Sequence, residues 1–155
     1  MNWGGRTSKA AFVLLARSSR PFAADGRRTL TNRGSRAQAT QSAAPAELLH
    51  TYTFHKRLAR TPGPSLVLFF SPFCGSCHAF RRVLPEVQER GAMTAFEVDA
   101  GDSPGLVNEH EVMDLPALFL YNDGEFHASI QAPPVVQELE AAVLRALGMP
   151  PEEAP

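Results

Sequence analysis

Residues 65–77 read SLVLFFSPFCGSC, an apolar run that leads through a short loop to two cysteines. The run from Ser65 to Phe70 is continuous and short, which is typical of a β-strand covered on both faces. After the cysteines, apolar residues recur at i, i+3, i+4 and i+7, the spacing of one helix face. They are Phe80, Val83, Leu84 and Val87. The sequence therefore predicts a buried strand that leads into an amphipathic helix, with the cysteines at the junction.

The rest of the chain predicts a single α/β domain over residues 46–148, followed by a flexible tail over 149–155. The further expected elements are a helix over 46–60 ended by Pro62-Gly63-Pro64, a strand over 92–98 after Gly91, a short helix from Ser103-Pro104 to Glu111, a strand over 115–121, a turn at Asn122-Asp123-Gly124, a strand over 125–130, and a helix from Pro133-Pro134 to Leu147. Strand–helix–strand order requires parallel pairing, and the hairpin adds an antiparallel strand. We expect a mixed four-stranded sheet with helices on both faces.

The cysteines Cys74 and Cys77 are the only two in the chain, which excludes a disulfide scaffold. A cysteine in the first turn of a helix meets unpaired backbone N–H groups and the positive end of the helix dipole, and both favour the thiolate. A second cysteine three residues later lies one turn deeper on the same face, so it can attack a mixed disulfide formed at the first. We predict thiol–disulfide exchange, with Cys74 as the exposed nucleophile, Cys77 as the buried resolving cysteine and Cys74–Cys77 as the redox disulfide.

Over residues 46–148 the sequence resembles the thioredoxin family. The resemblance rests on the apolar strand followed by SPFCGSC, on Leu115-Pro116 before LFLY, and on the NDGE turn. It implies a thioredoxin-like fold, with a cis proline at Pro116 beside the dithiol. By the same resemblance we assign Phe73, Leu115 and Pro116 to substrate binding.

The resemblance also implies an activity, that of a protein-disulfide reductase with protein disulfides as substrates. Electrons would come from an external thiol reductase or a glutathione-type donor. Such exchange needs only the two sulfurs, so we expect no bound cofactor and no metal.

Several positions depart from the family pattern. Phe73, Ser76 and His78 stand where thioredoxins usually have Trp, Pro and Lys, and a protonated His78 would help to hold Cys74 as a thiolate. Leu68 stands where the family usually has a buried Asp that helps to deprotonate the resolving thiol. Because apolar burial raises the pKa of a thiol, we expect slow release of substrate by Cys77 near neutral pH.

Three other functions compete with thiol–disulfide exchange. Leu68 supports a redox-weak thioredoxin-fold subunit that binds or assembles an organellar complex. The letters CGSCH match the c-type haem motif, in which His78 would ligate iron opposite a methionine or a histidine, but the α/β pattern disfavours that context. The remaining histidines are scattered, which disfavours a zinc site within one chain. They are His50, His55, His110 and His127.

Charge divides the chain into two parts. Residues 1–45 carry eight Lys and Arg against one Asp, a net +7, whereas residues 46–155 carry seven basic and fifteen acidic residues, a net −8. A leader rich in Arg, Ala, Ser and Thr is typical of an organellar transit peptide, and we expect import into the mitochondrial matrix, with a plastid as the second choice. A secretory signal around 10–16 and a basic disordered tail are the alternatives. The acidic remainder disfavours nucleic-acid binding, and no apolar run approaches the ~20 residues that span a membrane.

Overall fold

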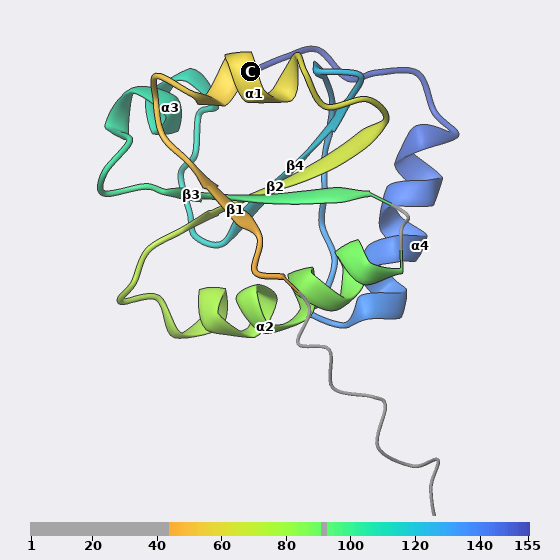
Figure 1. Ribbon diagram of the computed structural model, residues 1–155, viewed down its shortest axis with the longest axis horizontal. Coiled ribbons are helices and arrows are strands. Elements are labelled where there is room, and N and C mark those ends of the chain that lie inside the picture. Colours follow the sequence, from red (N-terminus) through yellow and green to blue (C-terminus); the bar gives the residue numbers. More distant parts are fainter. Residues whose placement is uncertain (1–43, 91–92) are drawn as a thin grey trace, which may run out of the picture. The chain divides into compact units, whose positions relative to one another are not determined.

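The computed structural model describes residues 44–90 and 93–155, in which a mixed five-stranded sheet lies between two pairs of helices (Figure 1). The strands are β1 (Glu47–Leu49), β2 (Pro64–Phe70), β3 (Thr94–Asp99), β4 (Ala117–Asn122) and β5 (Glu125–Ser129). The helices are α1 (Phe54–Leu58), α2 (Gly75–Glu89), α3 (Pro104–Glu109) and α4 (Val136–Leu147). Residues 1–43 of the predicted leader over 1–45 lie outside the described residues, as do the predicted helix end at Gly91 and strand start at Ala92.

The strand order in the sheet is β1-β3-β2-β4-β5. β1, β3 and β2 run parallel, whereas β4 pairs antiparallel with both β2 and β5. α1 and α3 cover one face of the sheet, and α2 and α4 cover the other (Figure 1). The predicted α/β class, mixed sheet and helices on both faces are confirmed.

The number of strands was predicted wrongly. In place of a helix over 46–60, the chain forms the edge strand β1, in register with Phe96–Val98 of β3, and then the short helix α1. Leu48 is exposed and Leu49 is buried, which is the alternation of a strand. The β-branched residues Thr51 and Thr53 disfavour a helix through this turn, so the helix begins only at Phe54.

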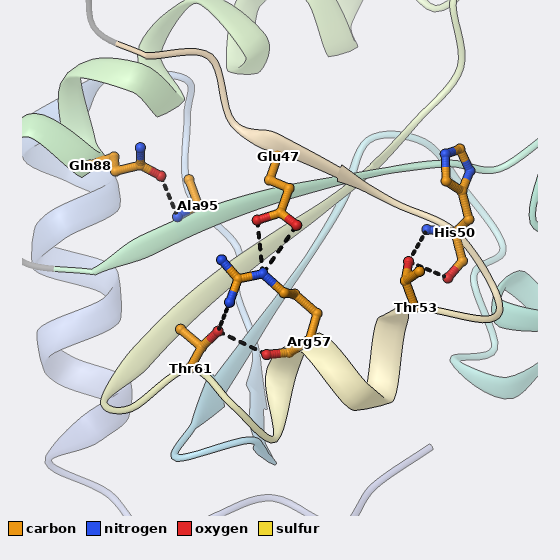
Figure 2. A network of polar contacts seen from close by, with 7 residues as sticks. All are labelled: Glu47, His50, Thr53, Arg57, Thr61, Gln88 and Ala95. Carbon is orange, nitrogen blue, oxygen red and sulfur yellow. Dashed lines mark hydrogen bonds and ion pairs between the residues drawn. The ribbon is translucent and has the colours of Figure 1, made fainter.

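Polar contacts tie β1 to α1 (Figure 2). The Nε of Arg57 donates to both carboxylate oxygens of Glu47, at 3.0 and 2.9 Å. Between the two elements, Thr53 Oγ1 accepts from the N–H of His50 and donates to its carbonyl, each at 3.1 Å. Exposed ion pairs contribute only about 0.2–1 kcal/mol, so this network sets the geometry of the edge more than its stability.

The central strand β2 separates two apolar cores. Leu66, Leu68 and Phe70 pack against α2 and α4, and Val67 and Phe69 pack against α1 and α3. All five side chains are buried. Burial of a large apolar side chain contributes about 1.5–3 kcal/mol, so β2 is the strand on which both helical layers depend.

Several boundaries differ from the predicted ones. Ser103 occupies the predicted N-cap of α3, but its hydroxyl is buried and makes no hydrogen bond. α4 begins at Val136, after the predicted Pro133-Pro134 start, because Val135 is extended and forms the N-cap. At the other end, Leu147 is only half-buried.

The C-terminal segment 149–155, predicted to be a flexible tail, contacts the sheet. The N–H of Glu152 donates to the carbonyl of His127 at 2.8 Å, and its carboxylate accepts from the N–H of Ser129 at 2.9 Å. Backbone groups at the edge of β5 therefore find partners in this segment. In the part of the chain that the structure describes, no helix combines the length and the apolar character needed to cross a membrane.

His110 is a buried titratable group in the core between the sheet, α1 and α3. Its Nδ1 donates to the carbonyl of Leu106 at 2.8 Å, so the other ring nitrogen accepts from the hydroxyl of Tyr121. The rings of Phe54 and Phe69 lie against it, with centroids 5.1 and 5.0 Å away. Desolvation in this aromatic setting lowers the pKa of His110, against a smaller opposing effect of the Leu106 carbonyl.

We expect the free energy of unfolding to fall as the pH drops below about 6.5, the ordinary pKa of histidine. Because the pKa of His110 is lowered in the folded chain, the unfolded chain binds more protons in that range. Guanidinium denaturation of the full chain at about pH 7.5 and about pH 5 measures the loss. In His110→Gln the free energy of unfolding should depend less on pH, whereas the exposed control His50→Gln should behave like wild type. An equal loss of stability between the two pH values in both variants would contradict the role of His110.

Candidate active site

The two cysteines lie where β2 gives way to α2, at the edge of the sheet where the parallel strands end. Cys74 is the N-cap of α2, and its sulfur is joined to that of Cys77 with the Cα atoms 5.3 Å apart. Cys77 is fully buried in the core between the sheet, α2 and α4, whereas Cys74 is partly exposed. Only the first sulfur is therefore open to a large reactant.

The sulfur of Cys74 lies among hydrogen-bond donors at the start of α2. It accepts from the N–H of Cys77 at 3.2 Å, and the hydroxyl of Ser76 lies 3.3 Å from it. These donors, together with the positive end of the helix dipole, stabilise a negative sulfur more than a neutral one. In the reduced chain the arrangement thus favours the thiolate at Cys74.

The residues assigned to substrate binding lie at the same edge of the sheet. Phe73 is 96% exposed and directly precedes Cys74. Leu115 and Pro116 are joined by a cis peptide bond just before β4, whose first residue, Ala117, is in register with Phe69 near the end of β2. Leu115 is half-buried and packs against both apolar cores. The structure thus brings these three residues to the edge that carries the dithiol.

His78 lies beside the dithiol in sequence, and its ring is exposed. Its Nε2 lies 3.2 Å from the carbonyl of Pro72, the geometry of an N–H···O hydrogen bond. No hydrogen bond joins His78 to either sulfur among the described residues. Its expected effect on the Cys74 thiolate stays a prediction.

A buried carboxylate near the dithiol was missed in the sequence. Glu97 lies in the middle of β3 and is 6% exposed. Its carboxylate accepts from the Nε of Arg81 on α2 at 2.9 Å, and the Arg81 guanidinium stacks over the ring of Phe70, 4.3 Å from its centroid. Burial raises the pKa of Glu97, and the ion pair with Arg81 opposes that rise. The available signal was a charged residue inside the otherwise apolar strand AMTAFEV.

No group of three or more His, Cys, Asp or Glu side chains that could hold a metal ion occurs in residues 44–90 and 93–155. The CGSCH stretch lies across a strand–helix junction, where Cys74 and Cys77 are bonded to each other. That placement suits exchange between sulfurs better than attachment of a haem.

Comparisons with known proteins agree on the family and the fold. A family model described as Thioredoxin matches residues 45–145. A solved structure of human ERp44 in its zinc-bound form aligns with a TM-score of 0.59 at 14% identity, over 66% of this chain and 30% of that one. Another, on thiol resolution in yeast mitochondrial 1-Cys peroxiredoxin through glutathione/thioredoxin systems, aligns with a TM-score of 0.56 at 20% identity, over 64% and 94%. The expected thioredoxin-like fold is confirmed.

Similar curated proteins come from several organisms. Thioredoxin Y, chloroplastic, of Oryza sativa subsp. japonica is 26% identical over 140 residues, which cover 86% of this chain and 77% of that protein. Thioredoxin-like protein slr0233 of Synechocystis sp. is 27% identical over 58% of this chain and 91% of that protein. Protein disulfide-isomerase A3 of Gallus gallus is 32% identical over 52% of this chain, but the match spans only 16% of that much longer protein.

We expect Cys74 to be alkylated at least roughly tenfold faster than Cys77 in the reduced full chain, because its sulfur is accessible and its thiolate is favoured. A time course with iodoacetamide, followed by mass spectrometry of the two cysteine positions, measures both rates. The denatured chain, in which both thiols are free in solvent, is the control. Equal rates in the folded chain would contradict the roles assigned to the two cysteines.

Proposed function

The chain belongs to the thioredoxin family, and we propose that it is a protein thiol–disulfide oxidoreductase that works through Cys74 and Cys77. One observation carries the proposal: a partly exposed sulfur at the N-terminus of α2 is paired with a fully buried one a single turn further on. The relatives named as thioredoxins and as a protein disulfide-isomerase support exchange of this kind. We propose that it acts in the direction of a protein-disulfide reductase.

In the proposed reaction, the Cys74 thiolate attacks one sulfur of a substrate disulfide, and the other substrate sulfur leaves as a thiolate. Cys77 loses its proton and attacks the sulfur of Cys74. This step breaks the mixed disulfide, releases the second substrate thiolate and forms the Cys74–Cys77 bond. Two electrons pass from the dithiol to the substrate, and an external thiol reductase or a glutathione-type thiol restores the dithiol.

Protein disulfides are the proposed substrates, and Phe73, Leu115 and Pro116 are proposed to bind them. The support is the exposure of Phe73, a large apolar side chain that directly precedes Cys74 in the chain. Contact with an apolar segment of a partner would hide this side chain from water. We propose that an extended substrate strand then lies along the half-buried segment at Leu115 and Pro116.

We further propose that residues 1–45 form an organellar leader and that the thioredoxin-like domain follows it. The support is compositional, since the leader carries a net +7 and the remainder a net −8. Relatives from Oryza sativa and Arabidopsis thaliana are named as chloroplastic, whereas the preference for a mitochondrion finds no support among the relatives. A plastid is therefore the proposed destination.

We expect the full chain to catalyse the reduction of insulin by dithiothreitol, and Cys74→Ser to lower the rate to that of dithiothreitol alone, because the attacking thiolate is gone. Turbidity of the released insulin B chain measures the rate. Glu125→Gln, an exposed position at the start of β5 that leaves both sulfurs and the loop around them unchanged, is the control. If the wild-type chain is inactive and co-purifies stably with a partner, the redox-weak binding subunit is the correct interpretation.

Residues 1–45 fused to a fluorescent reporter should enter plastids of a plant cell and be shortened there. Replacement of Arg6, Lys9, Arg17 and Arg20 by Gln should abolish import, because the positive charge is removed. Microscopy and immunoblotting provide the measurement. Cytosolic or secreted reporter would contradict an organellar leader, and reporter in mitochondria would contradict the plastid.

A further inference from the structure

The resolving step of the proposed exchange needs a proton acceptor. Cys77 is fully buried in an apolar core that also contains Leu68. Apolar burial favours the neutral thiol over the thiolate, yet only the thiolate attacks a disulfide. β2, the strand that runs beneath the dithiol, offers no carboxylate, because its residues are PSLVLFF.

Glu97 supplies a carboxylate on the adjacent strand. Among the residues that the structure describes, it is the one acidic residue that is buried. It is in register with Leu68 across the parallel β2–β3 pair. Paired residues of neighbouring strands project to the same face of a sheet, so Glu97 and Leu68 share the face that α2 and Cys77 cover.

Arg81 fixes the carboxylate under the first half of α2. It follows Cys77 by four residues, one helical turn, and therefore lies on the same side of the helix. Its Nε donates to Glu97 at 2.9 Å while its guanidinium stacks on Phe70, itself part of the core around Cys77. The ion pair thus holds Glu97 between the sheet and the helical turn that follows the resolving cysteine.

A pocket of about 400 Å³ connects this position with solvent. Glu97, Arg81 and His78 line it, together with Leu48 of the edge strand. Since the pocket is open and partly polar, water can enter it. A proton that reaches Glu97 therefore has an exit past His78.

We propose that Glu97 accepts the proton of Cys77 during resolution and passes it to solvent through this pocket. The proposal rests on the thiol–disulfide exchange proposed above. Cys77 gives its proton to the Glu97 carboxylate, and the resulting thiolate attacks the sulfur of Cys74. The substrate sulfur leaves with the electron pair of the broken bond, and water in the pocket takes the proton from the Glu97 carboxyl. With Glu97 as the proton acceptor, Cys77 releases the substrate efficiently even though Leu68 offers no carboxylate.

The charges around Glu97 set its pH response. From α2, Arg81, Arg82 and His78 face the pocket, and from β1 and β2 the neighbours are the apolar Leu48 and Leu68. Burial raises the pKa of Glu97 and Arg81 opposes that rise. A carboxylate accepts a proton more readily as its pKa approaches the working pH, so burial opposed by an ion pair suits this role.

Glu97→Gln tests the proposal, because it keeps the shape of the side chain and removes the proton acceptor. The reduced full chain is mixed in a stopped-flow instrument with 5,5′-dithiobis(2-nitrobenzoate), which releases one coloured thiolate on attack by Cys74 and a second on resolution by Cys77. At about pH 7 we expect the first release to stay within about twofold of wild type and the second to slow by about 100-fold. At about pH 9.5 the deficit should shrink to within about threefold, because hydroxide then deprotonates Cys77.

Glu47→Gln is the matched control. Glu47 is also a sheet glutamate paired with an arginine, Arg57, but it contacts α1 on the opposite face (Figure 2). Both releases should match wild type in this control. A second variant, Leu68→Asp combined with Glu97→Gln, returns a carboxylate to the neighbouring register position and should restore part of the second release.

Two results would overturn the role of Glu97. One is a second release in Glu97→Gln that is as fast as in wild type at about pH 7. The other is a slowing that is equal at every pH, which a merely structural change would produce. If wild type itself releases only the first thiolate, the proposed exchange fails at Cys77, and the role of Glu97 fails with it.

Discussion

Burial of β2 on both faces is the constraint on which the rest of the structure depends. The strand pairs with β3 on one side and β4 on the other, and its alternate side chains fill the two apolar cores. Because every position of the strand after Pro64 is buried, the chain can reach solvent only beyond Phe70. The loop that follows places Cys74 at the start of α2, and the apolar face of α2 then draws Cys77 into the core. The difference in exposure between the two sulfurs follows from this packing.

The same packing disfavours the thiolate form of Cys77, which the proposed exchange requires. A thiol held in an apolar core resists deprotonation, and a carboxylate buried in the adjacent strand is itself costly unless it is paired. Arg81 lowers that cost for Glu97 by a hydrogen-bonded ion pair at 2.9 Å and by stacking on Phe70. Without Arg81, a carboxylate in the middle of β3 would lose much of its charged character; without the pocket, its proton would have no path to water. In the proposed reaction, Glu97, its ion pair and the pocket supply the proton transfer that the apolar Leu68 cannot.

The elements around the dithiol were predictable from sequence, because β2 and α2 carry long and uniform hydrophobic patterns. β1 was not, because three residues at a sheet edge carry too little periodicity to stand out from the neighbouring α1, and its pairing with β3 joins residues far apart in the chain. Glu97 was visible as a charge in an apolar strand, but its partner Arg81 lies sixteen residues away on another element, and only the fold shows that they meet. The position of Leu115 and Pro116 beside the dithiol came from family resemblance, since no local pattern brings β4 next to β2.

Cys74 and Cys77 form either a redox couple or a structural bond, and the function of the chain depends on which. Equilibration of the full chain with mixtures of reduced and oxidised dithiothreitol, and of reduced and oxidised glutathione at the less reducing end, followed by alkylation and mass spectrometry, measures the fraction of the pair that is oxidised. We expect one two-electron transition with a potential between about −270 and about −120 mV, the range of exchange-active CxxC proteins. A pair that remains oxidised down to about −300 mV, as structural disulfides do, would contradict this expectation.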